Sequence, residues 1–375
     1  MLIGVPAEKD PAETRVAATP ETVKKFIGLG ADVAVEHGAG VEAGVPDADF
    51  QAAGARLVSA PEALGADVVL KVRRPKPEEI AALKNGALVV AVMDPYGHVE
   101  AIDALAKAGV SAFAMELLPR ITRAQVMDVL SSQANLAGYR AVLDAAAEYG
   151  RALPMMMTPA GTVPAAKMFI MGVGVAGLQA IATGRRLGAI VTATDVRPAT
   201  KEQVESLGAK FVAVEDEEFK QAETAGGYAK EMSDAYKAKQ ASLIAAHIAK
   251  QDIVVTTALI PGRPAPRLVT AEMVRSMRPG SVLVDLAVER GGNVELAKAG
   301  ELVTTDNGAK IIGYSSVTRL AATASALYSR NLYAFVETLI DKANKALAVN
   351  WDDELVKATC LTRGGAIVHP NFLPK

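Results

Sequence analysis

The chain has a single cysteine, Cys360, and only four histidines among its 375 residues. One thiol cannot form an internal disulfide, and one cysteine with scattered histidines makes no zinc ligand set. No apolar run reaches the roughly 18 to 20 residues needed to span a bilayer. The N-terminal segment MLIGVPAEKD lacks the basic and apolar regions of a secretory signal. We therefore expect a cytoplasmic chain with no metal site and no segment that enters a membrane.

The sequence also lacks an excess of charge of either sign. Its formal net charge is −2, its charged residues make up 22%, and half of its residues are hydrophobic. The lysines and arginines are scattered along the chain and form no basic cluster, which argues against a nucleic-acid partner. These values are typical of a globular protein of about two domains.

Short apolar runs rich in β-branched residues alternate with helical patterns, which indicates parallel sheets with crossover helices. The first series starts at residues 2–5 and continues with a helix that Thr19 and Pro20 begin and Gly28 or Gly30 ends. Its further strands are DVAVEH, DVVLKVR, ALVVAVM and SAFAME. The second series consists of KMFIMGVG, AIVTATDV, KFVAV, DIVVTTA, SVLVDLA and AKIIGYS.

The connections predict how these two series form domains. A helix of about 25 residues starting near residue 123 is long enough to join two domains. A second long helix, from about Leu320 to Leu347, returns the chain to the first domain, and TRGGAIVHP is a last short strand pair. Residues 153–164 are a proline-punctuated linker. We therefore expect domains at 1–138 plus 320–375 and at 139–319.

Residues 167–195 contain the pattern of a phosphate-binding turn: an apolar strand, Gly172-x-Gly174-x-x-Gly177, a helix, a second apolar strand and an acid. Gly172 allows the tight turn, Gly174 lets the backbone approach a pyrophosphate, and Gly177 permits close packing of helix on strand. The N-terminus of the helix attracts negative charge. The full strand-helix-strand context makes glycines that merely end a strand the weaker interpretation.

The acid of this pattern, Asp195, is placed to accept both hydroxyl groups of a ribose, and its carboxylate would repel a 2′-phosphate. The sequence therefore predicts a preference for NAD(H) over NADP(H), and Arg197 is the nearby feature that could soften it. Four more residues complete the predicted cofactor set: Val175 and Val196 beside the motif, and Ala258 and Leu259 in TTALIPG.

The ends of later strands are expected to line the same crevice, because ligands of such sheets bind at the carboxyl ends of the strands. TTALIPG follows one strand and VDLAVERGG follows the next. The long connection before them contains AETAGGYAKE, in which Gly226 and Gly227 precede Tyr228. This segment is either a lid that closes on bound nucleotide or a solvated loop with an incidental tyrosine.

The segment RAQVMDVLSSQANLAGYR, residues 123–140, has an unusual polar side if it forms one helix. At about 100° per residue, one sector collects short hydrogen-bonding groups with no Lys or Glu: Gln125, Asp128, Ser131, Ser132 and Asn135. We expect this side to face the nicotinamide end of the cofactor, with Arg120 within reach. The alternative is that the small polar residues pack against another helix.

Several segments resemble the NAD(H)-binding component, domain I, of proton-translocating nicotinamide nucleotide transhydrogenase: RITRAQVMDVLSSQANLAGYRAV, GVGVAGLQAIATGRRLGA, TDVRPATKEQVESLG and ETAGGYAKEM. The resemblance covers essentially the whole chain. It implies an α/β fold of two Rossmann-like domains with parallel sheets, joined by a long helix, in a homodimer. It also implies a partner component that binds NADP(H), with direct hydride transfer between the two nicotinamides and a membrane-spanning component that couples the transfer to proton translocation.

The resemblance assigns roles to individual residues. Arg120, Gln125, Asp128 and Ser131 contact the nicotinamide end, with Gln125 orienting the ring and Arg120 and Asp128 supporting it. The glycine motif and Asp195 hold the pyrophosphate and adenosine, and Tyr228 belongs to the family's mobile loop. Because the sequence stops at Lys375, we expect the NADP(H) and membrane components to be separate chains. This chain would then be peripheral on the cytoplasmic membrane and active only with them.

The nearest rival interpretation is alanine dehydrogenase, which shares this architecture and needs a cationic clamp for a keto acid. Arg15 and Lys71 stand where that clamp would be, in segments that resemble the dehydrogenase pattern. Glu289 replaces an aspartate of that family, and MDPYGHVE resembles its histidine loop only loosely, so His98 is doubtful as a catalytic acid. We therefore interpret Arg15 and Lys71 as structural.

A second alternative is a non-catalytic module that senses NAD(H) and regulates a membrane partner. Such a module needs to grip only the adenosine end of the nucleotide. The polar residues of the segment 123–140 disfavour it, because a sensor has no reason to orient the nicotinamide.

Overall fold

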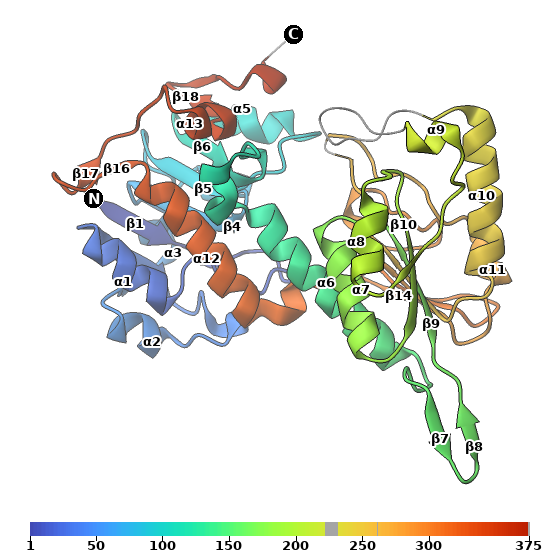
Figure 1. Cartoon of the computed structure of the whole chain (residues 1–375). Helices are drawn as coiled ribbons and strands as arrows, with labels where there is room; N and C mark the ends of the chain where they lie inside the picture. Colours follow the sequence, from blue (N-terminus) through green and yellow to red (C-terminus); the bar gives the residue numbers. More distant parts are fainter. Residues whose placement is uncertain (222–231, 261, 374–375) are drawn as a thin grey trace. The chain divides into compact units, whose positions relative to one another are not determined.

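The computed structural model describes residues 1–221, 232–260 and 262–373 (Figure 1). The chain divides into two compact units. Unit 1 comprises residues 1–133 and 317–375, and unit 2 comprises residues 134–316. The two passages of the chain between the units thus lie five and three residues before the sequence-based boundaries at 138/139 and 319/320.

Unit 1 is built on a parallel sheet with the strand order β3-β2-β1-β4-β5-β6. Its strands are nearly continuous apolar runs, as expected for a sheet that is covered on both faces. They are β1 (Leu2–Val5), β2 (Asp32–Glu36), β3 (Arg56–Val58), β4 (Val68–Arg73), β5 (Leu88–Val92) and β6 (Ser111–Ala114). The short strand β3 was not expected from the sequence.

The helices of unit 1 come from both ends of the chain. They are α1 (Pro20–Gly28), α2 (Asp47–Ala52), α3 (Ala60–Leu64), α4 (Pro77–Ile80), α5 (Val99–Lys107), α12 (Ala321–Glu337) and α13 (Glu354–Thr359), with 3₁₀ turns at Val41–Ala43, Met115–Leu117, Thr122–Met127, Thr318–Leu320 and Pro370–Phe372. As predicted, Thr19 is the N-cap of α1, Pro20 is its first residue, and Gly30 follows its end with φ +85°.

The larger core of unit 1 lies between the sheet and α1 and α12. Phe26 of α1, Phe113 of β6 and Tyr328, Leu332 and Phe335 of α12 are fully buried there. The returning C-terminal segment therefore completes this core. It also contains two antiparallel pairs, β16 (Ile340–Asp341) with β17 (Ala346–Leu347) and β18 (Thr362–Arg363) with β19 (Ala366–Ile367). The second pair confirms the prediction for TRGGAIVHP.

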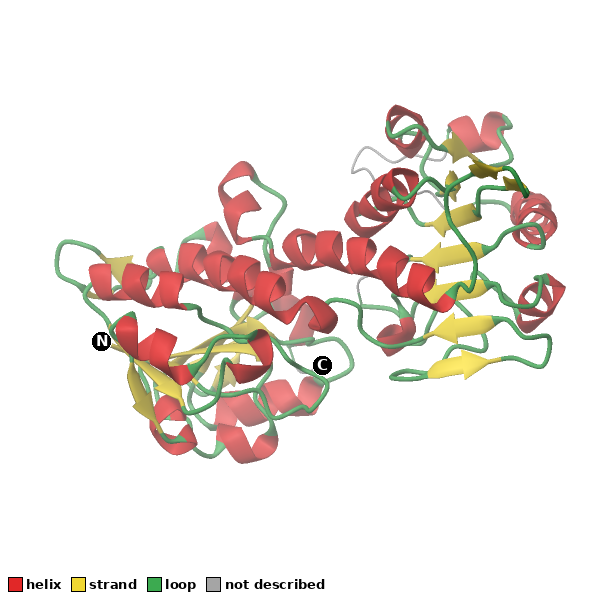
Figure 2. Cartoon of the chain, turned by 90° about the horizontal axis from the view of Figure 1, so that it is seen from below, coloured by secondary structure: helices red, strands yellow, loops and turns green. Residues whose placement is uncertain are grey.

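Unit 2 contains a second sheet, with the order β11-β10-β9-β12-β13-β15-β14. All pairs are parallel except β14 with β15 at the edge. Figure 2 shows these strands side by side with helices on both faces of the sheet. The strands are β9 (Lys167–Met171), β10 (Ile190–Thr194), β11 (Lys210–Phe211), β12 (Ile253–Thr256), β13 (Val282–Asp285), β14 (Leu302–Thr304) and β15 (Lys310–Ile312).

The helices of unit 2 cover two apolar cores, one on each face of its sheet. They are α7 (Val175–Arg186), α8 (Thr200–Ser206), α9 (Glu217–Lys220), α10 (Asp234–Ile248) and α11 (Ala271–Ser276), with a 3₁₀ turn at Val288–Arg290. Helix α6 (Val129–Glu148) contains the passage from unit 1 to unit 2, between Gln133 and Ala134. The predicted fold class, two Rossmann-like parallel sheets joined by a long helix, is therefore confirmed.

The prediction of one helix from residue 123 is wrong at its start. Residues Thr122–Met127 form a 3₁₀ turn, Asp128 has the non-helical ψ of 90°, and α6 begins at Val129. Asp128 ends the earlier turn because its side chain accepts hydrogen bonds from the backbone N–H of Ser131 (2.9 Å) and from its hydroxyl (2.6 Å). Aspartate is among the best N-cap residues, so this local bond competes successfully with a continuous helix.

Two other expectations are also wrong. The final helix ends at Glu337, and the Asp341 side chain then accepts from the backbone N–H groups of Ala343 and Asn344 to form the turn between β16 and β17. The linker at 153–164 contains an antiparallel hairpin, β7 (Met156–Thr158) with β8 (Gly161–Val163), which extends from unit 2 in Figure 1.

Candidate functional site: a dinucleotide cradle in unit 2

The three glycines of the motif follow β9 and differ in how much room they have. A Cβ atom on Gly172 would lie 2.5 Å from Oγ1 of Thr257, and its φ of +104° is strained for other residues. A Cβ atom on Gly177 would lie 1.9 Å from the carbonyl oxygen of Gly172. Around Gly174, no heavy atom of the described residues other than Gly174 itself and its two chain neighbours lies within 4 Å of the corresponding position. The outer two glycines thus permit packing, and the middle one leaves open space.

This open space lies at the N-terminus of α7, for which Gly174 is the N-cap residue. The helix has 12 residues and no acidic side chain in its first turn. Its first N–H groups and its dipole therefore favour an anion at this end. Val175, the first helical residue, is exposed beside it.

Asp195 follows the neighbouring strand, β10, and its carboxylate faces the same turn. Oδ2 accepts from the backbone N–H of Val173, in the glycine motif, at 2.8 Å. Arg197 also contacts Asp195, through an ion pair of 2.9 Å between Nε and Oδ1. Val196 is exposed between them. The structure thus brings the predicted ribose acceptor to the predicted phosphate turn.

The end of β12 forms the other side of the turn. Thr257 donates from Oγ1 to the carbonyl oxygen of Gly172 at 3.0 Å, which joins the two strand ends. Ala258 follows, half-buried, and Leu259 is exposed. Two of the predicted cofactor residues therefore lie on the strand end adjacent to the glycine turn.

Two buried residues stabilise this region: Asp285 is the last residue of β13, and Asn293 follows that strand. Asn293 is fully buried and its side-chain amide binds Ala258 and, at 2.8 Å, the carbonyl oxygen of Pro266. Asp285 is fully buried too, and burial raises the pKa of its carboxyl despite hydrogen bonds from the backbone of Val294 and Ala287.

The sequence reasoning missed Thr257 and Asn293 as residues that shape the cradle. Thr257 lies within the segment TTALIPG, which the sequence analysis placed at the crevice, and Asn293 directly follows VDLAVERGG. For Thr257, the available signal was a polar residue directly after an apolar strand; Asn293 lies eight residues after β13 and has no such signal. The specific partners depend on the register of the sheet, which the sequence does not reveal.

The residues assigned to the nicotinamide end lie in unit 1. Arg120 and Gln125 are exposed, and Asp128 and Ser131 are half-buried and bound to each other as described for the start of α6. The helical sector that grouped Gln125 with Ser131 does not exist, because α6 begins after both Gln125 and Asp128. Their roles toward a nucleotide stay predictions.

The next residues of that sector support the helix-packing alternative. Ser132 donates from Oγ to Oδ1 of Asn331, on α12, at 2.7 Å. Asn331 in turn donates to the carbonyl oxygen of Val126 at 2.8 Å. Asn135, within unit 2, lies 3.5 Å from Oε1 of Gln179 on α7. Small polar groups on this side therefore pack against two helices.

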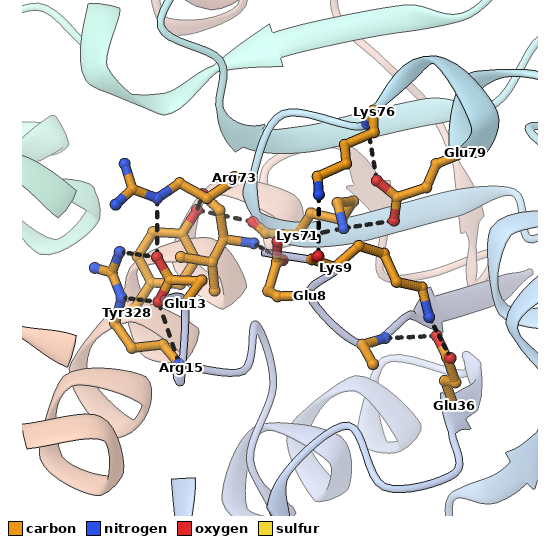
Figure 3. Close-up of polar contacts among 12 residues, drawn as sticks. Glu8, Lys9, Glu13, Arg15, Glu36, Lys71, Arg73, Lys76, Glu79 and Tyr328 are labelled. Carbon is orange, nitrogen blue, oxygen red and sulfur yellow. Dashed lines mark hydrogen bonds and ion pairs between the residues drawn. The ribbon is translucent and has the colours of Figure 1, made fainter. Parts of the chain in front are cut away.

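Arg15 and Lys71, the possible keto-acid clamp, are both buried and paired in unit 1 (Figure 3). Arg15 binds both carboxylate oxygens of Glu13, at 2.6 and 2.7 Å. Lys71, only 1% exposed, lies 2.8 Å from Glu79 and 3.3 Å from Glu8. A substrate carboxylate would have to compete with three carboxylates for these two cations.

Glu8, Glu13, Arg15, Lys71 and Glu79 form an ionic cluster. The pKa values of two of its acids, Glu8 and Glu13, are shifted in opposite directions. Burial raises the pKa of Glu8, and the charge of Lys71 offsets this only in part. Burial acts in the same direction on Glu13, but its hydrogen bonds and ion pairs with Arg15 and Arg73 outweigh it and lower the pKa of Glu13. Tyr328 donates to the carbonyl oxygen of Lys71 at 2.9 Å and ties the cluster to α12.

The remaining predicted residues lie elsewhere. Nδ1 of His98 is 2.9 Å from the carbonyl oxygen of Asp94 in unit 1, and Glu289 is exposed in a 3₁₀ turn of unit 2. Tyr228 lies outside the described residues. In the part of the chain that the structure describes, no cluster of His, Cys, Asp and Glu suits a metal ion. No helix there has the length and apolar character to cross a membrane.

Comparisons with known proteins agree with the two-unit architecture. Residues 4–137 match the model of the alanine dehydrogenase/PNT N-terminal domain, and residues 141–370 match that of the C-terminal domain. The chain is 55% identical to the first part of NAD(P) transhydrogenase subunit alpha of Rhodospirillum rubrum, over 99% of this chain and 98% of that protein. The solved structure of a transhydrogenase from Sinorhizobium meliloti is 61% identical, with a TM-score of 0.90 over 98% of this chain and 100% of that one.

Alanine dehydrogenases are more distant relatives. That of Bacillus subtilis is 32% identical over 79% of this chain and 72% of its own length. The resemblance to the transhydrogenase component, seen first in the sequence motifs, is thereby confirmed, and the chain belongs to the alanine dehydrogenase/PNT family.

Proposed function

We propose that this chain is the NAD(H)-binding component of a proton-translocating NAD(P) transhydrogenase. The observation that carries the proposal is the cradle in unit 2, where Gly174 leaves open space at the N-terminus of α7 and Asp195 faces the same turn. This arrangement fits a dinucleotide with a free ribose diol. The 55% identity to a transhydrogenase alpha subunit over almost the whole chain supports the particular activity.

In unit 2, backbone groups and side chains of the chain bind the pyrophosphate and the adenosine ribose of the nucleotide. The glycine turn lets N–H groups at the start of α7 bind the pyrophosphate, and Asp195 accepts the hydroxyl groups of the adenosine ribose. Val175, Val196, Ala258 and Leu259 provide apolar contacts around them. None of these contacts requires a proton transfer.

In unit 1, Arg120, Gln125, Asp128 and Ser131 are the proposed contacts of the nicotinamide end. Bound nicotinamide supplies the hydride chemistry, so the side chains need only orient the ring and exclude water. Gln125 is exposed and uncharged, which suits an amide that binds the carboxamide of the ring. We propose Gln125 as the orienting residue, with Arg120 and Asp128 as its support, and Tyr228 as part of a loop that closes over the nucleotide.

The proposed partners are a component that binds NADP(H) and a membrane-spanning component that couples hydride transfer to proton translocation, both on separate chains. The chain would lie on the cytoplasmic side of the membrane, attached through these partners. A second copy of the chain is the further partner. Three exposed methionines at the hairpin β7–β8, Met155, Met156 and Met157, support this homodimer, because a two-stranded hairpin has little stability alone in water.

Hydride transfer in the presence of a partner is the direct test. The purified chain is mixed with a purified NADP(H)-binding component, and the reduction of an NAD analogue by NADPH is followed by absorbance. We expect turnover with both proteins present and none with either alone. Tight NADH binding without turnover with any such partner would favour the sensor interpretation.

Alanine dehydrogenase remains the second candidate because the chain is 32% identical to the Bacillus subtilis enzyme, although the burial and ion pairs of Arg15 and Lys71 count against a keto-acid clamp. The chain alone is mixed with NADH, pyruvate and ammonium. Steady oxidation of NADH without a partner protein would support this activity and contradict the transhydrogenase proposal.

A further inference from the structure

The guanidinium group of Arg197 binds the carboxylate of Asp195 through two hydrogen bonds, a bidentate contact called the fork below. Nε donates to Oδ1 at 2.9 Å, and Nη2 donates to Oδ2 at 3.0 Å. This bidentate geometry is the strongest form of the contact between arginine and a carboxylate. Nη2 also lies 3.2 Å from the carbonyl oxygen of Val173, which aligns the fork further.

Backbone groups hold the other side of the same carboxylate. The N–H of Arg197 donates to Oδ1 at 2.9 Å, and the N–H of Val173 donates to Oδ2 at 2.8 Å. A carboxylate has about four lone-pair sites. Within the described residues, two of these sites on Asp195 are filled by backbone groups and two by the side chain of Arg197.

A ribose diol presents two neighbouring donors, as the fork of Arg197 does. If the proposed function holds, Asp195 must accept hydrogen bonds from these two hydroxyl groups. The backbone N–H groups occupy two of its lone-pair sites, and the fork of Arg197 occupies the other two. We infer that Arg197 is an internal competitor of the nucleotide: its side chain must leave Asp195 before the ribose can bind. Arg197 thereby weakens the binding of NAD(H).

The structure allows this exchange without movement of the main chain. The carbonyl oxygen of Arg197 accepts from the hydroxyl of Thr200 at 2.7 Å and from its N–H at 3.2 Å, so the backbone is anchored at the start of α8. The side chain of Arg197 is 32% exposed, whereas that of Asp195 is 8% exposed. Because the guanidinium group is partly exposed, it can move from the carboxylate into solvent and leave the carboxylate to a ligand. The two backbone N–H groups would keep the carboxylate oriented afterwards.

The displaced guanidinium would stay close to the ribose because its backbone is anchored. Arginine is the side chain best suited to bind a phosphate in two places at once. Compared with a chain that lacks this arginine, the chain with Arg197 therefore binds NADPH, which has a 2′-phosphate, more tightly relative to NADH. Its two effects both reduce the discrimination between NADH and NADPH.

Arg197→Lys tests the inference, because lysine keeps the positive charge but cannot present two donors in one plane. The Kd values of NADH and NADPH are measured by titration calorimetry on the full chain. We expect the Kd of NADH to fall by about three- to fivefold, as for loss of a part-exposed ion pair, and the ratio of the NADPH to the NADH value to rise. Arg186→Lys, exposed at the far end of α7, is the matched control and should change neither.

The same measurement in an Asp195→Asn background completes a double-mutant cycle. There the effect of Arg197→Lys should disappear, because the contested carboxylate is absent. An unchanged or increased Kd of NADH in Arg197→Lys would overturn the inference. So would an NADH complex in which the fork still binds Asp195. Failure of the unaltered chain to bind NADH at all would instead overturn the proposed function, so the two failures are distinguishable.

Discussion

The side-chain amide of Asn293 binds both polar groups of the Ala258 backbone. Oδ1 accepts from the N–H of Ala258 at 3.0 Å, and Nδ2 donates to its carbonyl oxygen at 2.9 Å. Nδ2 also binds the carbonyl oxygen of Pro266 at 2.8 Å. One buried side chain thus fixes the loop that follows β12, on which Ala258 and Leu259 are the proposed contacts of the nucleotide.

Asn293→Ala should therefore weaken the binding of NADH and lower stability together. The change leaves three backbone groups without these partners, and each unsatisfied buried group costs roughly 1 to 3 kcal/mol. We expect the Kd of NADH to rise about tenfold or more and the unfolding temperature to fall, as measured by calorimetry. Asn307→Ala is the matched control, since Asn307 binds the carbonyl oxygens of Val274 and Met277 in the same unit. It should lower stability and leave NADH affinity unchanged; an equal loss of affinity would refute the role of Asn293.

The glycine turn makes a sharper prediction, because two of its residues tolerate a methyl group very differently. Gly177→Ala should destabilise the fold, since its Cβ atom would clash with the carbonyl oxygen of Gly172 at 1.9 Å. Gly174→Ala meets open space, and its φ of −84° is ordinary for alanine. We expect Gly174→Ala to keep the unfolding temperature and to raise the Kd of NADH at least tenfold, because the methyl group occupies the place of the pyrophosphate. Unchanged NADH affinity in this variant would argue against the cradle.

The sequence predicted this turn well because the signal is local. The spacing of Gly172, Gly174 and Gly177, and an acid at the end of the next strand, describe one strand-helix-strand unit that hardly depends on the rest of the fold. The position of most strands was equally predictable, since buried parallel strands are continuous apolar runs. The antiparallel edge strand β14 and the pair β16–β17 carry no such signal.

The segment 123–148 shows where such reasoning fails. Helical periodicity cannot distinguish a residue inside a helix from the residue that begins it, and Asp128 is the latter. The partners of Ser132 and Asn293 are equally hidden, because they are far away in sequence. Contacts of this kind depend on how elements pack, and a single sequence has no pattern for them.

The ionic cluster of unit 1 predicts a specific pH dependence of stability. Burial raises the pKa of Glu8, which faces Lys71, Glu13 and Glu79, above its value in the unfolded chain. The folded state therefore holds this proton more tightly, and the contribution of Glu8 is largest below its unfolded pKa and is lost as the pH rises through its folded pKa. We expect the stability of Glu8→Gln relative to the unaltered chain to increase from pH 4 to pH 7, measured by urea unfolding.

Glu21 provides a control of opposite sign for this experiment. Its hydrogen bonds with Arg330 and Lys25 lower its pKa to about 2. Its contribution is present above the unfolded pKa and is lost as the pH falls toward the folded value. As the pH rises from about 2 to 5, the stability of Glu21→Gln relative to the unaltered chain should therefore decrease. Slopes of the same sign for both variants would contradict the electrostatic assignment.

The exposed methionines at the hairpin β7–β8 provide the test of the proposed homodimer. Met157 is 79% exposed on β7, and Met155 and Met156 precede it. Water contact of this much apolar surface is unfavourable unless a partner covers it. Met157→Ser should therefore shift the chain toward monomer in sedimentation equilibrium. Its circular dichroism spectrum and NADH affinity should stay unchanged, because none of the hydrogen bonds described for the cradle involves the hairpin. Val99→Ser removes an exposed apolar side chain from α5 and should leave the oligomeric state as it was. If the unaltered chain is a monomer, or if both variants dissociate equally, the hairpin is not the contact between copies.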